Sequence, residues 1–260
     1  MARRKAGSQQ TRTAADTPGA GKKRRAGKSA GREAHRYPGV DGWQLFAAEA
    51  AYADSMVKSA LGDGVGCLAA LRQSIEALPT YAPAILSLGS AEYQRRRPAQ
   101  GCKLFLSLLE LPDDTPDLVE IIDKAGDFLI GRKRYGDGLE LYRRAAKRFP
   151  CVAVLHQGSG CCAGNQRLYD EALASSRTAL DLDPENQKFT NDFGWSLYEA
   201  GRLTEARDGL ERAVAMDPSD ELAAENLRLC ARDLEARKGR GVSSNRRTSG
   251  RKRQAKRDAT

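Results

Sequence analysis

Residues 193–218 read FGWSLYEAGRLTEARDGLERAVAMDP, a pattern typical of two short helices joined by a tight turn. Apolar residues recur at helical spacing before Gly201, and the same spacing resumes after it. Pro218 ends the second helix because proline lacks an N–H donor and clashes with the preceding turn. Trp195 lies roughly 200° around the helix from Phe193, so it falls outside the stripe that faces the core. The stretch therefore predicts a helix pair with one aromatic side chain that helix packing does not explain.

The same pattern recurs upstream with a period of 34 residues, and each period predicts another helix pair. The units are 48–81, 82–115, 119–152, 153–186 and 187–220, and residues 116–118 are inserted after the second unit. We expect the insertion to add a helical turn, with Thr115 as the N-cap and Pro116 at the first helical position. The first unit fits least well because Asp54 stands where an apolar residue is usual.

These residues resemble the tetratricopeptide repeat family. The matching positions are the small residues and proline Gly194, Gly201, Ala206, Ala213 and Pro218, and the large apolar residues Phe193, Leu197 and Leu210. The resemblance covers about 170 residues. It implies an all-α, right-handed α-solenoid of helix-turn-helix repeats with a concave groove that binds a peptide or helix of a partner protein. It implies no catalysis.

Both ends of such an array need a cover for their apolar faces. Residues 221–236 continue as one amphipathic helix, which we expect to cover the last repeat. At the other end we expect the first helix to begin near Trp43, and Trp43, Leu45 and Phe46 to cap the first repeat.

In this family the groove is lined by the first helix of each repeat, and the resemblance places eight partner-binding residues there. They are Tyr52, Tyr93, Glu120, Asp123, Asp127, Asn191, Trp195 and Tyr198. We predict a basic or aromatic-bearing partner, with Asp123 and Asp127 pairing with cations and Trp195 offering its ring face. Acidic residues at these positions argue against a clamp for an acidic C-terminus. The alternative is that the aromatic residues pack between adjacent helices and the acids are only solvated.

The charge of the chain is strongly partitioned. Residues 1–40 and residues 237–260 each carry a net charge of +9, and because the whole chain also carries +9, the body 41–236 carries −9. Residues 1–39 contain no Val, Leu, Ile, Phe or Trp, so we expect a disordered N-terminal arm over residues 1–40, and we expect the same of the C-terminal tail. The densest basic residues are Lys22, Lys23, Arg24, Arg25, Arg251, Lys252, Arg253, Lys256 and Arg257.

These basic tails support a second functional hypothesis, a protein associated with DNA or RNA in which the tails give affinity and the repeats recruit partners. Nuclear import, or a purely solubilising role, also fits such charge runs. The chain lacks an apolar stretch long enough to cross a membrane and lacks a secretory signal. We therefore expect a cytoplasmic protein, with a nuclear location as the alternative in a eukaryote.

The sequence predicts neither an enzyme nor a bound cofactor. It contains two histidines and no phosphate-binding loop, nucleophile elbow or dinucleotide fingerprint. The six cysteines are expected to be free thiols. The group Cys151, His156, Cys161 and Cys162 lacks the spacing of a zinc site, so we predict no metal. The leading hypothesis is a non-enzymatic protein-interaction scaffold.

Overall fold

The computed structural model describes residue 37 and residues 39–237, and every regular element in this part of the chain is helical. The helices form five pairs: α2 (Gly42–Ala60) with α3 (Gly64–Ala77), α4 (Ala82–Gln94) with α5 (Pro98–Ser107), α6 (Leu118–Gly131) with α7 (Tyr135–Arg148), α8 (Ala153–Asn165) with α9 (Tyr169–Leu182), and α10 (Gln187–Glu199) with α11 (Leu203–Met216). A short 3-10 helix, η1 (Leu108–Glu110), follows α5, and residues 221–237 are also helical.

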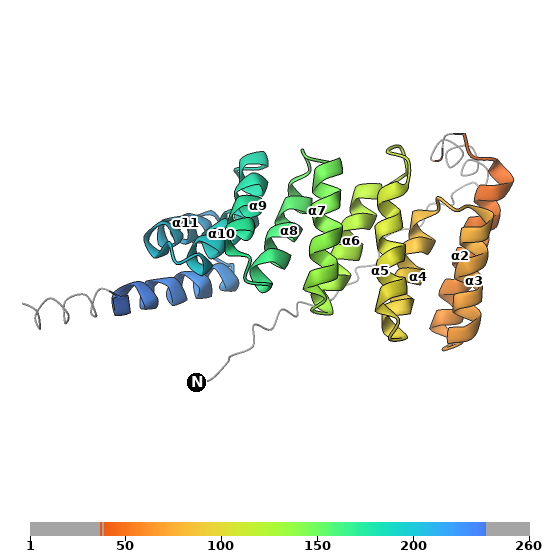
Figure 1. Cartoon of the computed structure of the whole chain (residues 1–260), viewed down its shortest axis with the longest axis horizontal. Coiled ribbons are helices and arrows are strands. Elements are labelled where there is room, and N and C mark those ends of the chain that lie inside the picture. Colours follow the sequence, from red (N-terminus) through yellow and green to blue (C-terminus); the bar gives the residue numbers. More distant parts are fainter. Residues whose placement is uncertain (1–36, 38, 238–260) are drawn as a thin grey trace, which may run out of the picture.

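Successive pairs stack side by side into an elongated α-solenoid, which confirms the predicted fold class (Figure 1). The first helices α4, α6, α8 and α10 contact one another in turn. Among the described second helices, only α5 and α7 make comparable contact. Because the first helices approach one another more closely, they line the inner side of the array and the second helices its outer side. The face formed by α4, α6, α8 and α10 is called the inner face below.

Several helices begin at side-chain caps that the sequence supplies locally. Asp41 accepts a hydrogen bond from the backbone N–H of Gln44 at the start of α2. Asp63 does the same for Gly66 in α3, with Oδ1 2.8 Å from the nitrogen. Asn186 accepts from the first turn of α10. These oxygens pair with N–H groups that have no partner inside the helix, which fixes where the helices start.

The core depends on the close approach of helices at glycines. Tyr142 of α7 is fully buried, and its ring lies where a methyl group at Gly126 of α6 or Gly158 of α8 would stand. One large side chain therefore fills the space that two small residues leave on neighbouring first helices. Earlier in the array, Tyr93 of α4 stacks on Phe105 of α5 with ring centroids 5.6 Å apart. Among the described residues, the buried apolar side chains fall into four clusters, and the one that contains Tyr93, Phe105 and Tyr142 extends from Ala82 to Ala172.

The connection between α5 and α6 differs from the prediction. Thr115 does not cap a helix: its carbonyl accepts from Leu118 N–H in a turn, and α6 starts only at Leu118. Asp117, at φ 56°, adopts the left-handed conformation that breaks the expected helical turn. Arg148 of α7 anchors this loop by donating to the carbonyl of Leu109 at 2.6 Å and to that of Leu111 at 2.5 Å.

The two ends of the array are finished differently. Residues 221–237 pack on the last pair, and Cys230 in that helix is fully buried. At the other end Leu45 is buried, but Trp43 and Phe46 are 78% and 63% exposed, so these two residues do not cap the first repeat as predicted. None of the described helices is both long enough and apolar enough to cross a membrane. The predicted disordered arms lie outside the described residues, except for residues 37, 39, 40 and 237.

Candidate functional site

The inner face carries four carboxylates that lie close together on α6 and α10. Asp123 and Asp127 are one turn apart on α6, and Asp192 and Glu199 belong to α10. The thiol of Cys161 on α8, the helix between them, has its pKa raised to about 11, first by burial and then by Asp192, Asp127 and Glu199. Three of the four carboxylates thus act on a single sulfur atom. We call Asp123, Asp127, Asp192 and Glu199 the carboxylate row.

Neutral hydrogen bonds hold this row in place. The Tyr142 hydroxyl donates to Asp123 Oδ1 at 3.0 Å, and the Gln157 amide of α8 donates to Asp192 Oδ2 at 2.7 Å. The Glu199 carboxylate sits beside Gly164 of α8, where a side chain on that residue would displace it. The hydrogen-bond partners are a phenol, two amides and the indole of Trp195, so none of them neutralises a carboxylate.

The pKa of every carboxylate in the row lies above its ordinary value. Burial is the main cause for each of them. The charge on Asp127 raises the pKa of Asp123 further, and the hydrogen bond from Tyr142 opposes this. Within the described part of the chain, no ion pair joins a Lys or Arg to a member of the row, although the charge of Lys188, one turn before Asp192, lowers the pKa of Asp192. Among the described residues the row is therefore an acidic surface on which only Asp192 has a cation, Lys188, acting on its pKa.

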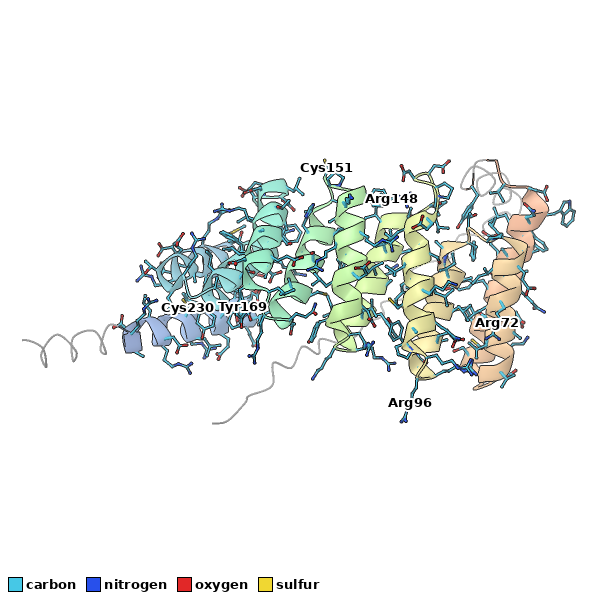
Figure 2. The ribbon with its side chains drawn as sticks, viewed as in Figure 1. Arg72, Arg96, Arg148, Cys151, Tyr169 and Cys230 are labelled. Atoms are coloured by element: carbon cyan, nitrogen blue, oxygen red, sulfur yellow. The ribbon has the colours of Figure 1, made fainter. Side chains whose placement is uncertain are left out.

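Two aromatic side chains adjoin the row at the end of α10. The rings of Trp195 and Tyr198 lie 4.8 Å apart between centroids at an interplanar angle of 31°. Trp195 is half-buried and lines a hollow of about 780 Å³ together with Tyr198 and Glu199. Tyr169 of α9 and Leu203 of α11 complete the walls (Figure 2 labels Tyr169). Trp195 thus belongs to a surface hollow next to the row rather than to the core.

Three other predicted residues, Glu120, Tyr52 and Tyr93, are not part of the row. Glu120 is exposed and forms an ion pair with Lys124 at 2.7 Å, so its charge is compensated. Tyr52 is half-buried and packs edge-to-face on Tyr81 with centroids 5.6 Å apart. Tyr93 is only 9% exposed, and its hydroxyl donates to Asp137 of α7 at 2.8 Å.

Helix 221–237 covers the remaining predicted position. Asn191 is 3% exposed, and it accepts a hydrogen bond from Asn226 of that helix at 3.1 Å. Tyr198 also reaches the helix, because its hydroxyl donates to Asp233 Oδ2 at 2.6 Å. Tyr93 and Asn191 therefore offer almost no surface to a partner.

Sequence reasoning missed half of the carboxylate row. Asp192 and Glu199 each directly follow a residue of the predicted stripe, Asn191 and Tyr198. A strict spacing of three and four omits these neighbours. The signal that could have found them is the acidic side chain one place beyond the stripe on the same helix.

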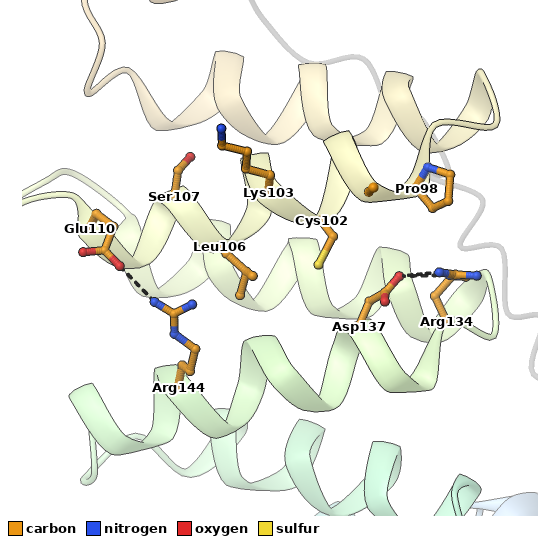
Figure 3. A pocket seen from close by; sticks show the side chains of 10 residues that line it. Pro98, Cys102, Lys103, Leu106, Ser107, Glu110, Arg134, Asp137 and Arg144 are labelled. Carbon is orange, nitrogen blue, oxygen red and sulfur yellow. Dashed lines mark hydrogen bonds and ion pairs between the residues drawn. The ribbon is translucent and has the colours of Figure 1, made fainter.

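A second depression lies on the outer side, between α5 and α7 (Figure 3). Its volume is about 690 Å³, and its walls include Cys102, Leu106 and Lys103. Ion pairs close both ends: Arg144 reaches Glu110 at 2.9 Å, and Arg134 reaches Asp137 at the same distance. Because both of its carboxylates, Glu110 and Asp137, are already paired with arginines, this depression offers less to a basic ligand than the inner face does.

The cysteines of the rejected zinc group are dispersed. His156 Nε2 lies 2.9 Å from the carbonyl oxygen of Pro150, Cys151 is exposed, and Cys162 is buried. Burial raises the pKa of the Cys162 thiol to about 12. In the described ranges, no three His, Cys, Asp or Glu side chains are grouped so that they could hold a metal ion.

Comparison with known proteins identifies the repeats. Residues 160–221 match the tetratricopeptide repeat family model. Over 108 residues the chain is 26% identical to small glutamine-rich tetratricopeptide repeat-containing protein 2 of Mycosarcoma maydis, covering 42% of this chain and 31% of that protein. It is 31% identical over 108 residues to the probable UDP-N-acetylglucosamine–peptide N-acetylglucosaminyltransferase SPINDLY of Arabidopsis thaliana, covering 42% of this chain and 12% of that enzyme. The chain thus matches less than a third of the length of either relative.

Solved structures give likenesses of the same kind. YrrB, described as a tetratricopeptide repeat protein with an unusual peptide-binding site, aligns with a TM-score of 0.48 and 17% identity over 67% of this chain and 89% of that one. The first repeat domain of Spaghetti (RPAP3) bound to an HSP90 peptide aligns with a TM-score of 0.42 and 18% identity over 45% of this chain and 93% of that one. Residues 160–221 therefore match tetratricopeptide repeats, and they lie within a stack of five helix pairs.

Proposed function

We propose that this chain is a non-enzymatic scaffold whose inner face binds a basic segment of a partner protein. The observation that carries the proposal is the carboxylate row, whose four members have raised pKa values. Among the described residues, no cation acts on the pKa of Asp123, Asp127 or Glu199, and Lys188 lowers that of Asp192 only in part. A Lys or Arg side chain placed against the row would favour the ionised form of the carboxylates. Its N–H groups would also donate the hydrogen bonds that water can no longer donate to the buried oxygens. The ligand chemistry that fits is therefore an extended peptide or helix rich in Lys and Arg.

The aromatic pair refines this ligand. Trp195 and Tyr198 border the row through Glu199, which lies on the same helix and accepts a hydrogen bond from Trp195. A guanidinium that pairs with Glu199 can also lie over the indole face, and such a contact contributes about 0.5–2 kcal/mol. Arginine should be preferred to lysine near Trp195 because its planar group stacks and pairs at once.

The test is a peptide-binding measurement with matched charge variants. Fluorescence anisotropy should give the highest affinity for an Arg-rich peptide, a lower affinity for a Lys-rich peptide and the lowest for an Asp/Glu-rich peptide. Added salt should weaken the binding of the basic peptides. Asp123→Asn with Asp127→Asn should weaken Arg-rich peptide binding about tenfold, because charge-assisted hydrogen bonds are lost. Glu76→Gln with Glu140→Gln removes two exposed carboxylates of α3 and α7 and is the control. Equal losses in the two double variants would refute the inner face as the site.

The nucleic-acid hypothesis concerns residues outside the described part of the chain, and it remains a separate prediction. The acidic inner face would repel phosphate groups, so nucleic-acid binding would depend on the basic tails alone. Deleting residues 1–36 and 238–260 should leave Arg-rich peptide binding intact and abolish any binding to nucleic acid. If the trimmed chain loses the peptide as well, the inner face is not sufficient for partner binding.

A further inference from the structure

The first helix carries an apolar stripe on the side opposite to the core. Trp43, Phe46, Val57 and Leu61, the residue after α2, are 58–79% exposed. At 100° per residue they share one face with Ala47, Ala50 and Ala53, which are also exposed. The core-facing residues Leu45, Ala48 and Ser55 lie on the opposite side of the same helix. We call the exposed set, Trp43, Phe46, Ala47, Ala50, Ala53, Val57 and Leu61, the α2 stripe.

An exposed stripe of this kind needs a partner surface. Isolated exposed apolar residues are common, but a continuous row along a five-turn helix usually marks an interaction site. The stripe is also the uncovered end of a solenoid, whereas residues 221–237 cover the opposite end. The one acid on this face, Asp54, forms an ion pair with Lys58 of the same helix at 2.6 Å, so its charge is already compensated.

The rest of this chain cannot supply the cover. Residues 1–36 contain no Val, Leu, Ile, Phe or Trp, and residues 238–260 contain only Val242 from that group. Segments of such composition do not bury enough apolar surface to dock on the stripe. An apolar helix face of a second copy of this chain is a cover with the right chemistry.

The stripe is complementary to itself. When two copies of α2 run antiparallel about an axis near residue 52, Trp43 of each lies opposite Leu61 of the other. Ala47 then lies opposite Val57, and Ala50 lies opposite Asp54. Phe46 lies opposite Lys58, whose ammonium already pairs with Asp54 of its own helix. Bulky side chains therefore meet at both ends, and alanines at the centre let the two helix axes approach closely.

We propose that α2 forms a symmetric antiparallel dimer with α2 of a second copy of this chain. A standard interface buries roughly 800 Å² on each partner. Four bulky side chains bury less than this, so we expect a weak dimer whose population depends on protein concentration. The inner faces stay open, since the stripe points away from the core of the array. A dimer would present two carboxylate rows to a partner with two basic segments, which raises its avidity without any new contact. This inference does not depend on the proposed ligand.

Sedimentation equilibrium of the full chain over micromolar to hundreds of micromolar concentration tests the proposal. The apparent mass of the wild type should rise from 28.3 kDa towards twice that value. Ala50→Glu should keep the monomer mass throughout, because the new carboxylates would face each other and Asp54 of the partner subunit. Ala215→Glu adds the same charge at an exposed site on α11 and should dimerise like the wild type. Circular dichroism checks that both variants are folded.

The sign of the charge tests the antiparallel register. Ala50→Lys places an ammonium opposite Asp54 of the partner subunit, so this variant should keep the dimer that Ala50→Glu loses. A wild type that remains monomeric at every concentration, or an Ala50→Glu variant that dimerises as the wild type does, would overturn the proposal. Loss of the dimer in both the Glu and Lys variants would overturn the register.

Discussion

Tyr142 of α7 lies against Gly126 of α6 and Gly158 of α8 at once, and its hydroxyl donates to Asp123 Oδ1 at 3.0 Å. One buried side chain of the outer layer therefore passes between two inner helices and reaches the carboxylate row. The packing of the array and the electrostatics of its inner face are joined at this residue.

Adding a methyl group at either glycine should destabilise the protein. Gly126→Ala and Gly158→Ala force the Tyr142 ring to move, and overpacking of this kind costs about 1–3 kcal/mol. Gly136→Ala on α7 is the matched control, because the nearest atom to its added methyl is Gln166 Oε1 at 3.9 Å. Urea unfolding followed by circular dichroism measures the three free energies of unfolding. Three equal values would contradict the packing described for Tyr142.

Removing the Tyr142 hydroxyl should change the titration of Asp123. The hydrogen bond from Tyr142 lowers the pKa of Asp123 against the opposing effect of burial, so Tyr142→Phe should raise this pKa further. The ring remains, so the fold should persist. Carbon-detected NMR titration of the aspartate carboxyl groups reports the shift, and Tyr135→Phe on the same helix should leave Asp123 unchanged. A pKa of Asp123 that stays constant in Tyr142→Phe would show that the bond is absent in solution.

Neutralising Asp192 should stabilise the protein at neutral pH. Burial raises the pKa of Asp192 in the folded state above its unfolded value of about 3.9. For such a group the stabilising contribution is complete below the unfolded pKa and is lost as the pH rises through the folded pKa. Asp192→Asn should therefore have a higher Tm than the wild type at neutral pH, and the gain should shrink towards about pH 4.

Thermal unfolding across this pH range measures the effect. Glu76→Gln at an exposed site on α3 should follow the wild type at every pH. An Asp192→Asn variant that is less stable at neutral pH would mean that the bond from Gln157 outweighs the burial of the charge.

Breaking the amide pair between Asn191 and Asn226 should loosen helix 221–237. Asn226→Ala leaves a buried amide oxygen of Asn191 without its donor, which costs about 1–3 kcal/mol. Hydrogen exchange should accelerate most in residues 221–237 and much less in α6 or α7. Glu225→Ala, one residue earlier and exposed, is the control. Uniform acceleration along the chain would show that this helix unfolds together with the repeats.

The two tryptophans should separate the two proposals. Trp195→Ala should lower the affinity for a monovalent Arg-rich peptide by about 2- to 30-fold, which corresponds to 0.5–2 kcal/mol, and should leave the dimer intact. Trp43→Ala should weaken the dimer and leave peptide affinity unchanged. Anisotropy and sedimentation on the same samples check both. If either variant affects both readouts equally, the inner face and the α2 stripe are not independent sites.

The sequence by itself determined the architecture, because helix periodicity, small residues at crossings and terminating prolines are local signals repeated every 34 residues. Repetition makes such a signal strong, and the structure has five helix pairs in succession. The residues of the insertion, 116–118, did not by themselves predict its conformation. There, a left-handed Asp117 and the hydrogen bonds from Arg148 in another helix determined the path of the loop.

Only the tertiary structure decided which side chains are available to a partner. Asn191 and Trp195 share one predicted stripe, yet helix 221–237 covers the first and leaves the second on a hollow. Asp192 and Glu199 belong to the row because α8 holds them there: the Gln157 amide donates to Asp192, and Gly164 leaves room for the Glu199 carboxylate. Exposure and pKa depend on what neighbouring helices place within a few ångströms. A one-dimensional repeat pattern does not contain that information, whereas the spacing of apolar residues along the chain already contains the fold.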